Sequence, residues 1–177
     1  MPIADARVLI LGADDVEDME LLYPLYRLRE ENATVTLATL GGRPITGKKG
    51  HGPVAPDAAT DDVRSADFDA LVIPGGYSPD KLRVDDDVVA FVRGFFDQGK
   101  TVAAICHAPS LLVEADVLRG RTLTSWPSVR KDVENAGGKW VDREVVRDGN
   151  LITSRKPGDL DAFCAALLEG VARRASA

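Results

Sequence analysis

Cys106 and His107 are the adjacent residues of this chain best suited to chemistry. They follow the apolar run at 102–105 and precede Pro109, which fits the first turn of a helix because its missing N–H is not needed there. A thiol at such a strand-to-helix turn meets free N–H groups and a helix dipole, which favour a thiolate. The layout is that of a nucleophile elbow with Cys in place of Ser.

A buried, inert cysteine is the alternative interpretation of Cys106, since many free cysteines are small core residues. The adjacent His107 favours catalysis, because a thiol nucleophile usually needs an imidazole or an acid to activate it. Cys164 lies within a predicted helix beside Phe163 and Leu167 and is expected to be core. Two cysteines and two histidines, widely spaced, predict neither a disulfide framework nor a zinc site, and no cofactor is expected.

The elements that must position Cys106 alternate along the chain. Short apolar or β-branched runs predict strands, and helical spacing of apolar residues predicts helices. In chain order we expect a strand at 7–12, a helix at 16–31, a strand at 34–40, short strands or a hairpin within 41–57, a helical turn at 62–66, a strand at 70–74, a helix at 80–98, the strand before Cys106 with a helix ending near 120, a strand at 122–125, a helix at 127–136, a hairpin at 144–154 and a helix at 157–174.

Pro24 lies inside the first of these helices and predicts a kink or break near Tyr23. The alternation of strands and helices favours a doubly wound α/β fold, with a mostly parallel sheet and helices on both faces. The length of 177 residues favours one domain, spanning 1–177. In such sheets ligands bind beyond the carboxyl ends of the strands, which here are 12–17, 74–80 and Cys106-His107.

Three groups at that edge have two interpretations each. Glu17 is either a solvated acid complementing the helix dipole or a buried carboxyl near the thiol. An ionised carboxylate would raise the thiol pKa, whereas a neutral carboxyl would donate a hydrogen bond to a thiolate. Gly75-Gly76 is either a tight turn or the source of an N–H that forms an oxyanion hole with the N–H of His107. Asp80, after Pro79, is either a helix cap or a site residue.

Composition limits the classes of protein that this chain can be. The net charge of −6 disfavours general nucleic-acid binding through a basic surface. No apolar run approaches the roughly 20 residues that span a bilayer, so no membrane association is expected. The first residues lack a basic region followed by an apolar one, so no secretory signal is expected and the cytoplasm is the default compartment.

Several motifs, in the same order along nearly the whole chain, resemble those of the PfpI family of intracellular cysteine proteases and deglycases. They are Asp-Val-Glu-Asp-Met-Glu-Leu-Leu-Tyr-Pro at 15–24, Ile-Thr-Gly-Lys at 45–48, Ala-Leu-Val-Ile-Pro-Gly-Gly at 70–76, Ala-Ile-Cys-His-Ala-Pro at 104–109, Leu-Arg-Gly-Arg at 118–121, Thr-Ser-Trp-Pro at 124–127, Asn-Ala-Gly at 135–137 and Asp-Gly-Asn at 148–150. The family belongs to the superfamily of the parkinsonism-associated deglycase, and the resemblance implies its flavodoxin-like, glutamine-amidotransferase-like fold.

The resemblance also implies roles for particular residues. Cys106 matches the nucleophile, His107 its neighbouring imidazole, Glu17 the buried carboxyl and Gly76 the oxyanion-hole amide. Asp80 matches the acid that reaches the histidine of a neighbouring subunit, which implies a homodimer or a larger oligomer built from dimers. Relatives more often carry Glu at that position, and Trp126 stands where Tyr is common.

Deglycase, glyoxalase-type, peptidase and chaperone activities belong to this family. We favour cysteine-dependent hydrolysis of glyoxals or glyoxal-derived adducts, with a small carbonyl compound or a glycated amino group as substrate and protection against carbonyl stress as the purpose. An intracellular cysteine peptidase is the alternative, as is a non-enzymatic redox sensor or chaperone that uses Cys106 oxidation. A glutamine amidotransferase is disfavoured because no histidine follows His107 to complete its triad.

Overall fold

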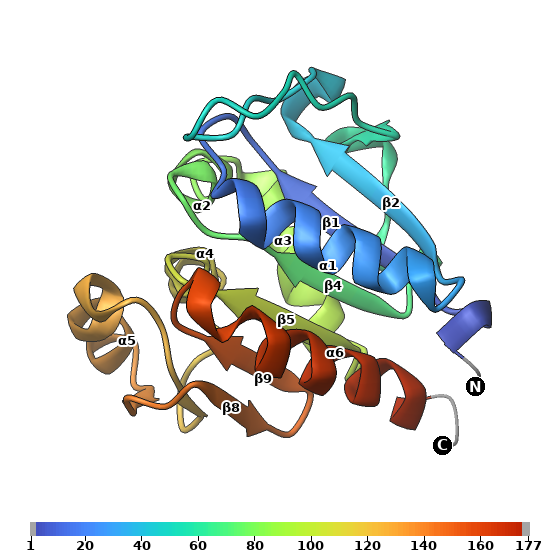
Figure 1. Cartoon of the computed structure of the whole chain (residues 1–177). Helices are drawn as coiled ribbons and strands as arrows, with labels where there is room; N and C mark the ends of the chain where they lie inside the picture. Colours follow the sequence, from blue (N-terminus) through green and yellow to red (C-terminus); the bar gives the residue numbers. More distant parts are fainter. Residues whose placement is uncertain (1–2, 175–177) are drawn as a thin grey trace.

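A mostly parallel sheet of seven strands forms the centre of the molecule (Figure 1). The computed structural model describes residues 3–174, so both ends of the domain predicted at 1–177 lie outside the described residues. The strand order is β3-β2-β1-β4-β5-β9-β8, and only β8 runs antiparallel to its neighbour. The bounds are Arg7–Gly12 (β1), Thr34–Thr39 (β2), Ala58–Ala59 (β3), Ala70–Ile73 (β4), Thr101–Ile105 (β5), Val145–Asp148 (β8) and Leu151–Ser154 (β9).

Helices cover both faces of this sheet, which confirms the predicted doubly wound α/β fold. In Figure 1, α1 and α6 lie side by side over the near face, where they contact each other, while α3 lies behind the sheet. The helices are Asp18–Glu30 (α1), Ser78–Leu82 (α2), Asp86–Asp97 (α3), Pro109–Glu114 (α4), Arg130–Asn135 (α5) and Leu160–Arg174 (α6). A second, two-stranded parallel sheet joins Thr122–Leu123 (β6) to Lys139–Trp140 (β7).

The strands bury side chains on both faces because successive residues of a strand point to opposite sides. Leu9 and Leu71 belong to the apolar cluster that contains the buried residues of α3 and α4. Ile10 and Val72, one residue further along, belong to the cluster that contains those of α1 and α6. This two-sided burial explains why the strands are continuous apolar runs.

Three of the predicted helices differ from the structure, and one of them is α4, which ends at Glu114 rather than near 120. Helix α1 runs through Pro24, so of the kink or break expected near Tyr23 the break is wrong. The carbonyl of Glu20 loses its N–H partner there, but the buried Leu21, Leu25 and Leu28 keep the helix on the sheet. The helix expected at 80–98 is two helices, because the carboxylate of Asp85 accepts hydrogen bonds from the N–H groups of residues 87 and 88 and starts α3 afresh.

The remaining segments follow the sequence pattern more closely. The Gly- and Pro-rich segment 41–57 holds an antiparallel bridge between Ile45 and Val54, and single 3-10 turns occupy Thr60–Asp62 and Ser65–Asp67. The hairpin predicted at 144–154 is formed by β8 and β9. Strand β7 was not anticipated. None of the helices within residues 3–174 is long and apolar enough to cross a membrane.

Candidate active site

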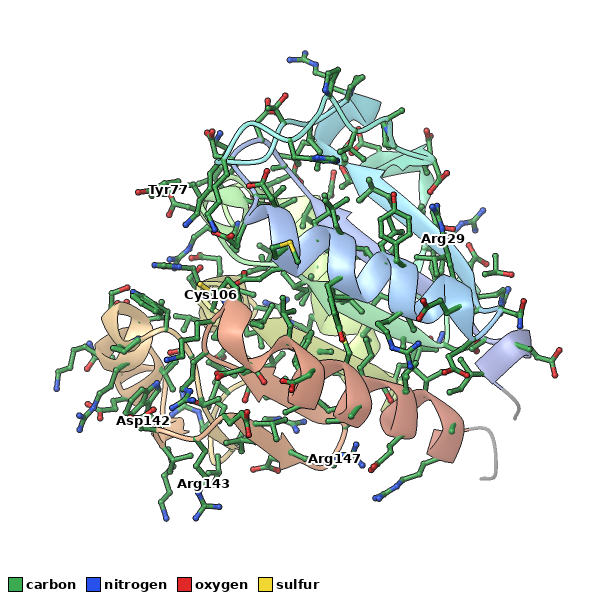
Figure 2. The ribbon with its side chains drawn as sticks, viewed as in Figure 1. Arg29, Tyr77, Cys106, Asp142, Arg143 and Arg147 are labelled. Carbon is green, nitrogen blue, oxygen red and sulfur yellow. The ribbon has the colours of Figure 1, made fainter. Side chains whose placement is uncertain are left out.

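Cys106 lies directly after β5, at the carboxyl edge of the sheet, where the chain turns into α4 (Figure 2). Its backbone takes a positive φ of 65°, which is rare for a residue other than glycine. The turn is fixed because the N–H of Cys106 donates to the carbonyl of Ser154 and its own carbonyl accepts from the N–H of Trp126. The thiol is 5% exposed, so the strained turn holds it just below the surface.

His107 contacts the thiol of Cys106 directly. Its Nδ1 lies 3.2 Å from Cys106 Sγ, and its Nε2 lies 3.2 Å from the hydroxyl oxygen of Ser128. The indole of Trp126 stacks on the ring, with centroids 6.3 Å apart. Burial lowers the pKa of His107, and the charge of Lys48 lowers it further. The imidazole is therefore neutral near pH 7 and can accept the thiol proton.

Glu20 is the carboxyl that lies beside the thiol. It is fully buried in the first turns of α1, and its Oε2 accepts a hydrogen bond of 2.8 Å from the N–H of Gly75. Its Oε1 is buried without a hydrogen-bond partner among the described residues. Burial raises the pKa of Glu20 to about 8, and the nearby charge of Glu17 also raises it. The carboxyl is therefore mostly protonated near pH 7.

Glu17 was expected to be this carboxyl, and the structure corrects that expectation. Helix α1 begins at Asp18, which leaves Glu17 at the N-cap and places Glu20, one turn later, toward Cys106. Glu17 is buried, but its carboxylate is held by the ammonium groups of Lys48 at 2.8 Å and Lys49 at 2.6 Å. Burial would raise the pKa of Glu17, and these two lysines hold it below its ordinary value instead. Glu17 is therefore ionised.

Opposing influences act on the ionisation of Cys106. Burial raises the pKa of Cys106 to about 12, with a negative charge on Glu20 adding to the rise, while the N–H groups of Gly76 and His107 donate toward sulfur and lower it. Because Glu20 is mostly neutral below about pH 8, its charge is largely absent near pH 7. The resting thiol is then protonated, with His107 Nδ1 next to it. Cys164, by contrast, is 2% exposed in the core, as expected.

The turn after β4 brings two glycines against the thiol. A Cβ on Gly75 would lie 2.6 Å from the Cβ of Cys106 and 2.5 Å from Glu20 Oε2, so only glycine allows this approach. Gly76 has a φ of 72° and bridges to Val16 in the turn after β1. The three strand ends expected at one edge are thus in contact, and two backbone N–H groups converge on the sulfur.

Asp80 lies in α2 and lines the same hollow as His107. This hollow of about 310 Å³ opens beside His107, the neighbour of the thiol, and is lined by Gly76, Tyr77, Asp80, Arg83, His107, Ser110, Ser128, Val129 and Asp132. The structure gives no hydrogen bond between Asp80 and His107 within the described chain; Ser128 occupies the outer nitrogen of the imidazole instead. Asp80 is exposed, as are Tyr77 and Asp132.

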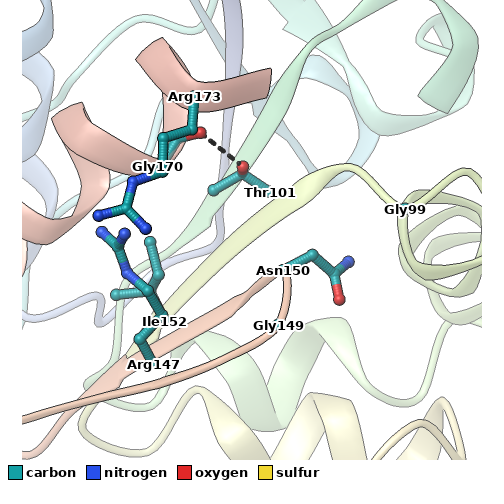
Figure 3. Close-up of a pocket in the computed structure, with 8 residues that line it drawn as sticks. All are labelled: Gly99, Thr101, Arg147, Gly149, Asn150, Ile152, Gly170 and Arg173. Atoms are coloured by element: carbon teal, nitrogen blue, oxygen red, sulfur yellow. Dashed lines mark hydrogen bonds between the residues drawn. The ribbon is translucent and has the colours of Figure 1, made fainter. Parts of the chain in front are cut away.

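A larger hollow of about 470 Å³ lies at the opposite end of β5 (Figure 3). It is lined by Gly99, Thr101, Arg147, Gly149, Asn150, Ile152, Gly170 and Arg173. The two guanidinium groups face one another across it, and both form ion pairs of 3.5 Å with Glu169. Thr101 begins β5 and Cys106 follows its end, so this hollow is separated from the thiol by the length of the strand.

Four residues around the thiol were missed or left without a role: Glu20, Lys48, Trp126 and Ser128. Glu20 could have been found, because Glu20, Pro24 and Leu28 recur at a spacing of four and share the buried face of α1. The contacts of Lys48 and Ser128 could not be predicted. Lys48 reaches the site from a loop and Ser128 from the 3-10 turn Pro127–Val129, 31 and 21 positions away from their partners, and no local pattern indicates such a contact.

Comparisons with known proteins show which sequences and folds this chain is similar to. The DJ-1/PfpI family model matches residues 6–170. A deglycase of Thermococcus kodakarensis is 50% identical over 157 residues, covering 89% of this chain and 94% of the relative. Protein/nucleic acid deglycase 2 of Escherichia coli is 45% identical over 159 residues, covering 89% and 92%. The crystal structure of Drosophila melanogaster DJ-1beta is similar with a TM-score of 0.87, at 32% identity over 97% of this chain and 96% of that one.

Proposed function

We propose that this chain, which belongs to the DJ-1/PfpI family, is a cysteine-dependent hydrolase of glyoxals and of the adducts that glyoxals form with amino groups. The observation that carries the proposal is the contact of 3.2 Å between Cys106 Sγ and His107 Nδ1 at a strained strand-to-helix turn. Deglycase is also the name of relatives at 45% and 50% identity, which supports the same class of reaction.

The first step is addition of the thiol to the aldehyde carbon. His107 Nδ1 accepts the proton of Cys106, the sulfur attacks, and a C–S bond forms as the C=O π electrons move onto oxygen. The N–H groups of Gly76 and His107 would hold that oxyanion. Neutral Glu20 donates toward sulfur when the sulfur is anionic, so it stabilises the thiolate without adding a negative charge.

The net reaction on a 2-oxoaldehyde is the addition of water to give a 2-hydroxy acid. The aldehyde carbon is oxidised while the neighbouring ketone carbon is reduced, so electrons balance within the substrate. The hydrogen on the aldehyde carbon of the adduct moves as a proton to the neighbouring ketone carbon through an enediol, which leaves a thioester of the 2-hydroxy acid. Water then adds to the thioester carbonyl, the C–S bond breaks to release the acid, and the departing thiolate takes back a proton. An adduct on an amino group would use the same attack on carbon, with the amine as leaving group. The open hollow beside the thiol suits small substrates of this kind.

A second subunit completes the site in this proposal. Asp80 lies on the rim of the hollow, and in a closed dimer the Asp80 of one subunit would face the His107 of the other. An acid at that point would orient the imidazole and stabilise it once it is protonated. Intracellular peptidase activity would use the same nucleophile and oxyanion donors on an amide carbonyl.

A substrate comparison of two cysteine variants tests the proposal. Cys106→Ser should lower the turnover of methylglyoxal by at least about a thousandfold, read by NMR as lactate formed. Cys164→Ala is the matched control, since it removes the other thiol from the core and should leave turnover close to that of the parent chain. A fluorogenic peptide assayed alongside separates peptidase from glyoxalase activity. Undiminished turnover in Cys106→Ser would contradict the nucleophile.

A further inference from the structure

Lys48 lies on a loop that backbone hydrogen bonds connect to the site. Its N–H donates to the carbonyl of Val16 at 2.9 Å, and Val16 bridges to Gly47 on one side and to Gly76 on the other. The loop, the N-terminus of α1 and the turn of Gly76 therefore form one connected ladder. The position of Lys48 is fixed relative to the N–H groups that point at the thiol.

The side chain of Asp18 holds the loop from the other side. Its two carboxylate oxygens accept hydrogen bonds of 2.9 Å from the N–H groups of Lys49 and His51. A Cβ on Gly47 would overlap that carboxylate, so glycine is required for the loop to close on it. The side chains of both lysines therefore project from a rigid turn rather than from a free surface loop.

The two lysines share one partner, Glu17, but differ in the exposure of their side chains. Both ammonium groups contact the buried carboxylate of Glu17, while the side chain of Lys48 is 35% exposed and that of Lys49 is 61% exposed. The Glu17 hydrogen bond raises the pKa of Lys48, and negative charge on Cys106 and Glu20 raises it further. The charge of Lys48 also acts on Glu20 and on His107. For His107, the charge of Lys48 contributes to the shift and that of Lys49 does not.

We propose that Lys48 is an electrostatic positioning residue of the catalytic site, whose fixed ammonium group stabilises the Cys106 thiolate. Anchored on Glu17, it supplies the positive charge that favours anionic sulfur while the buried carboxyl beside the sulfur is neutral. The same charge disfavours a protonated His107 in the resting site, so the imidazole stays available as a base. Glu17, rather than acting on the thiol, holds this cation in place.

A test must separate the effect of Lys48 on the thiol from the effects of the other charged and titratable groups around it. They are Glu20 and Glu17 from the start of α1, His107 from the turn after β5 and Lys48 from the loop. Removing Lys48 leaves one lysine on Glu17, and so does removing Lys49. The two variants therefore match in leaving Glu17 one lysine, and Lys48→Met in addition removes the ammonium group that interacts with Cys106 and Glu20.

The experiment compares Lys48→Met, Lys48→Arg and Lys49→Met by the rate of iodoacetamide labelling at Cys106 at one fixed, mildly alkaline pH, where the rate follows the small fraction of thiolate. Lys48→Met should lower this rate about three- to tenfold, because loss of the cation raises the pKa of the thiol. Lys48→Arg should restore the rate of the parent chain because it restores the charge, and Lys49→Met should leave that rate unchanged. Circular dichroism and melting temperature show that each variant is folded.

A second readout follows the imidazole. The chain has two histidines, so the His107 resonance is identified by its absence in His107→Asn. Its NMR titration midpoint should rise in Lys48→Met and not in Lys49→Met. Equal shifts in the two methionine variants, or none in Lys48→Met, would overturn the proposal. This inference rests on the proposed function, but both readouts work without turnover. The two readouts can contradict the role of Lys48 while the proposed hydrolase activity is confirmed, and the substrate comparison can contradict that activity while the two readouts confirm the role of Lys48.

Discussion

The thiol of Cys106 depends on a conformation that its own side chain disfavours. A non-glycine residue at a positive φ typically costs on the order of 1–3 kcal/mol, and Cys106 holds a φ of 65°. The surrounding hydrogen bonds to Ser154 and Trp126 enforce it. The strain turns the sulfur toward the N–H groups of Gly76 and His107, which a relaxed backbone would not do.

Glu20 gives a prediction about stability against pH. Its pKa is raised from 4.5 to about 8 in the folded chain, so the folded state keeps this proton to a higher pH than the unfolded state does. The contribution of protonated Glu20 to the free energy of unfolding is complete below about pH 4.5 and decreases as the pH rises to about 8. Glu20→Gln removes the titration. The free energy of unfolding of the parent chain should therefore fall, relative to Glu20→Gln, by on the order of 3 kcal/mol across that range, as measured by urea denaturation.

Glu17 is the control for this prediction, since it lies one turn away and has a shift of the opposite sign. Its pKa is lowered in the folded chain, so it stabilises above its unfolded pKa and that stability disappears as pH falls through its folded pKa. Glu17→Gln should then be destabilised at neutral pH and approach the parent chain in acid. If both variants follow the same pH trend, Glu20 is not the protonated carboxyl.

At the scale of elements, the longer parallel strands and their alternation with helices could be predicted, because most of them are short apolar or β-branched runs bounded by Gly, Pro or a polar cap. The ends of the helices could not be predicted from the same pattern. The first helix begins at Asp18 rather than at 16 and carries Glu20 toward the thiol, and an N-cap at Asp85 divides one predicted helix into two. Packing of buried leucines, which no local pattern reports, decided that α1 continues through Pro24.

The candidate site could be predicted only where its members follow strand ends. Cys106, His107 and Gly76 qualify, since parallel strands deliver their carboxyl ends to one edge. Lys48 comes from a loop and Ser128 from the 3-10 turn Pro127–Val129, and their contacts with Glu17 and His107 depend on how these connections pack. Loop closure is set by long-range hydrogen bonds such as those to Asp18, which the sequence does not display.

The turn after β4 gives a prediction at the scale of an element. Gly76 has a φ of 72°, and a Cβ there would overlap the backbone of Asp15 and residue 17. Gly76→Ala should therefore cost more than the conformational penalty alone, about 2–4 kcal/mol in all. It should also slow turnover, because displacing the turn moves the N–H that faces the sulfur. Thermal unfolding and methylglyoxal turnover measure the two effects.

Gly99→Ala is the matched control for this turn. Gly99 has a φ of 60°, but a Cβ there would meet no atom within 4 Å. The substitution should cost about 1 kcal/mol for the backbone conformation and leave turnover unchanged. Equal losses of stability in the two variants would mean that the backbone of Asp15 yields to the added carbon, and the turn would not be the rigid element described above.

At the scale of the whole molecule, the open side of the thiol site is where a second copy would matter. Cys106 is closed off by the sheet, α1 and the turn of Gly76, and the hollow beside it is rimmed by exposed Tyr77, Asp80 and Asp132. Within the described chain the imidazole of His107 has only the neutral Ser128 on its outer nitrogen. A carboxylate from a partner would bring the charge that a protonated imidazole needs.

Mixing two inactive variants tests whether Asp80 acts across a dimer. Asp80→Asn should lower turnover of methylglyoxal without changing the fold. Asp132→Asn, on the same rim, should leave turnover unchanged. Asp80→Asn mixed with Cys106→Ser should then regain activity, since each mixed dimer holds one site with an intact Cys106 facing an intact Asp80. Random exchange makes half of the dimers mixed, so about a quarter of the parent activity should return. If Asp80 served the His107 of its own chain, every mixed dimer would lack a complete site. Activity would then stay at the level of the separate variants. Native mass spectrometry verifies that the subunits have exchanged.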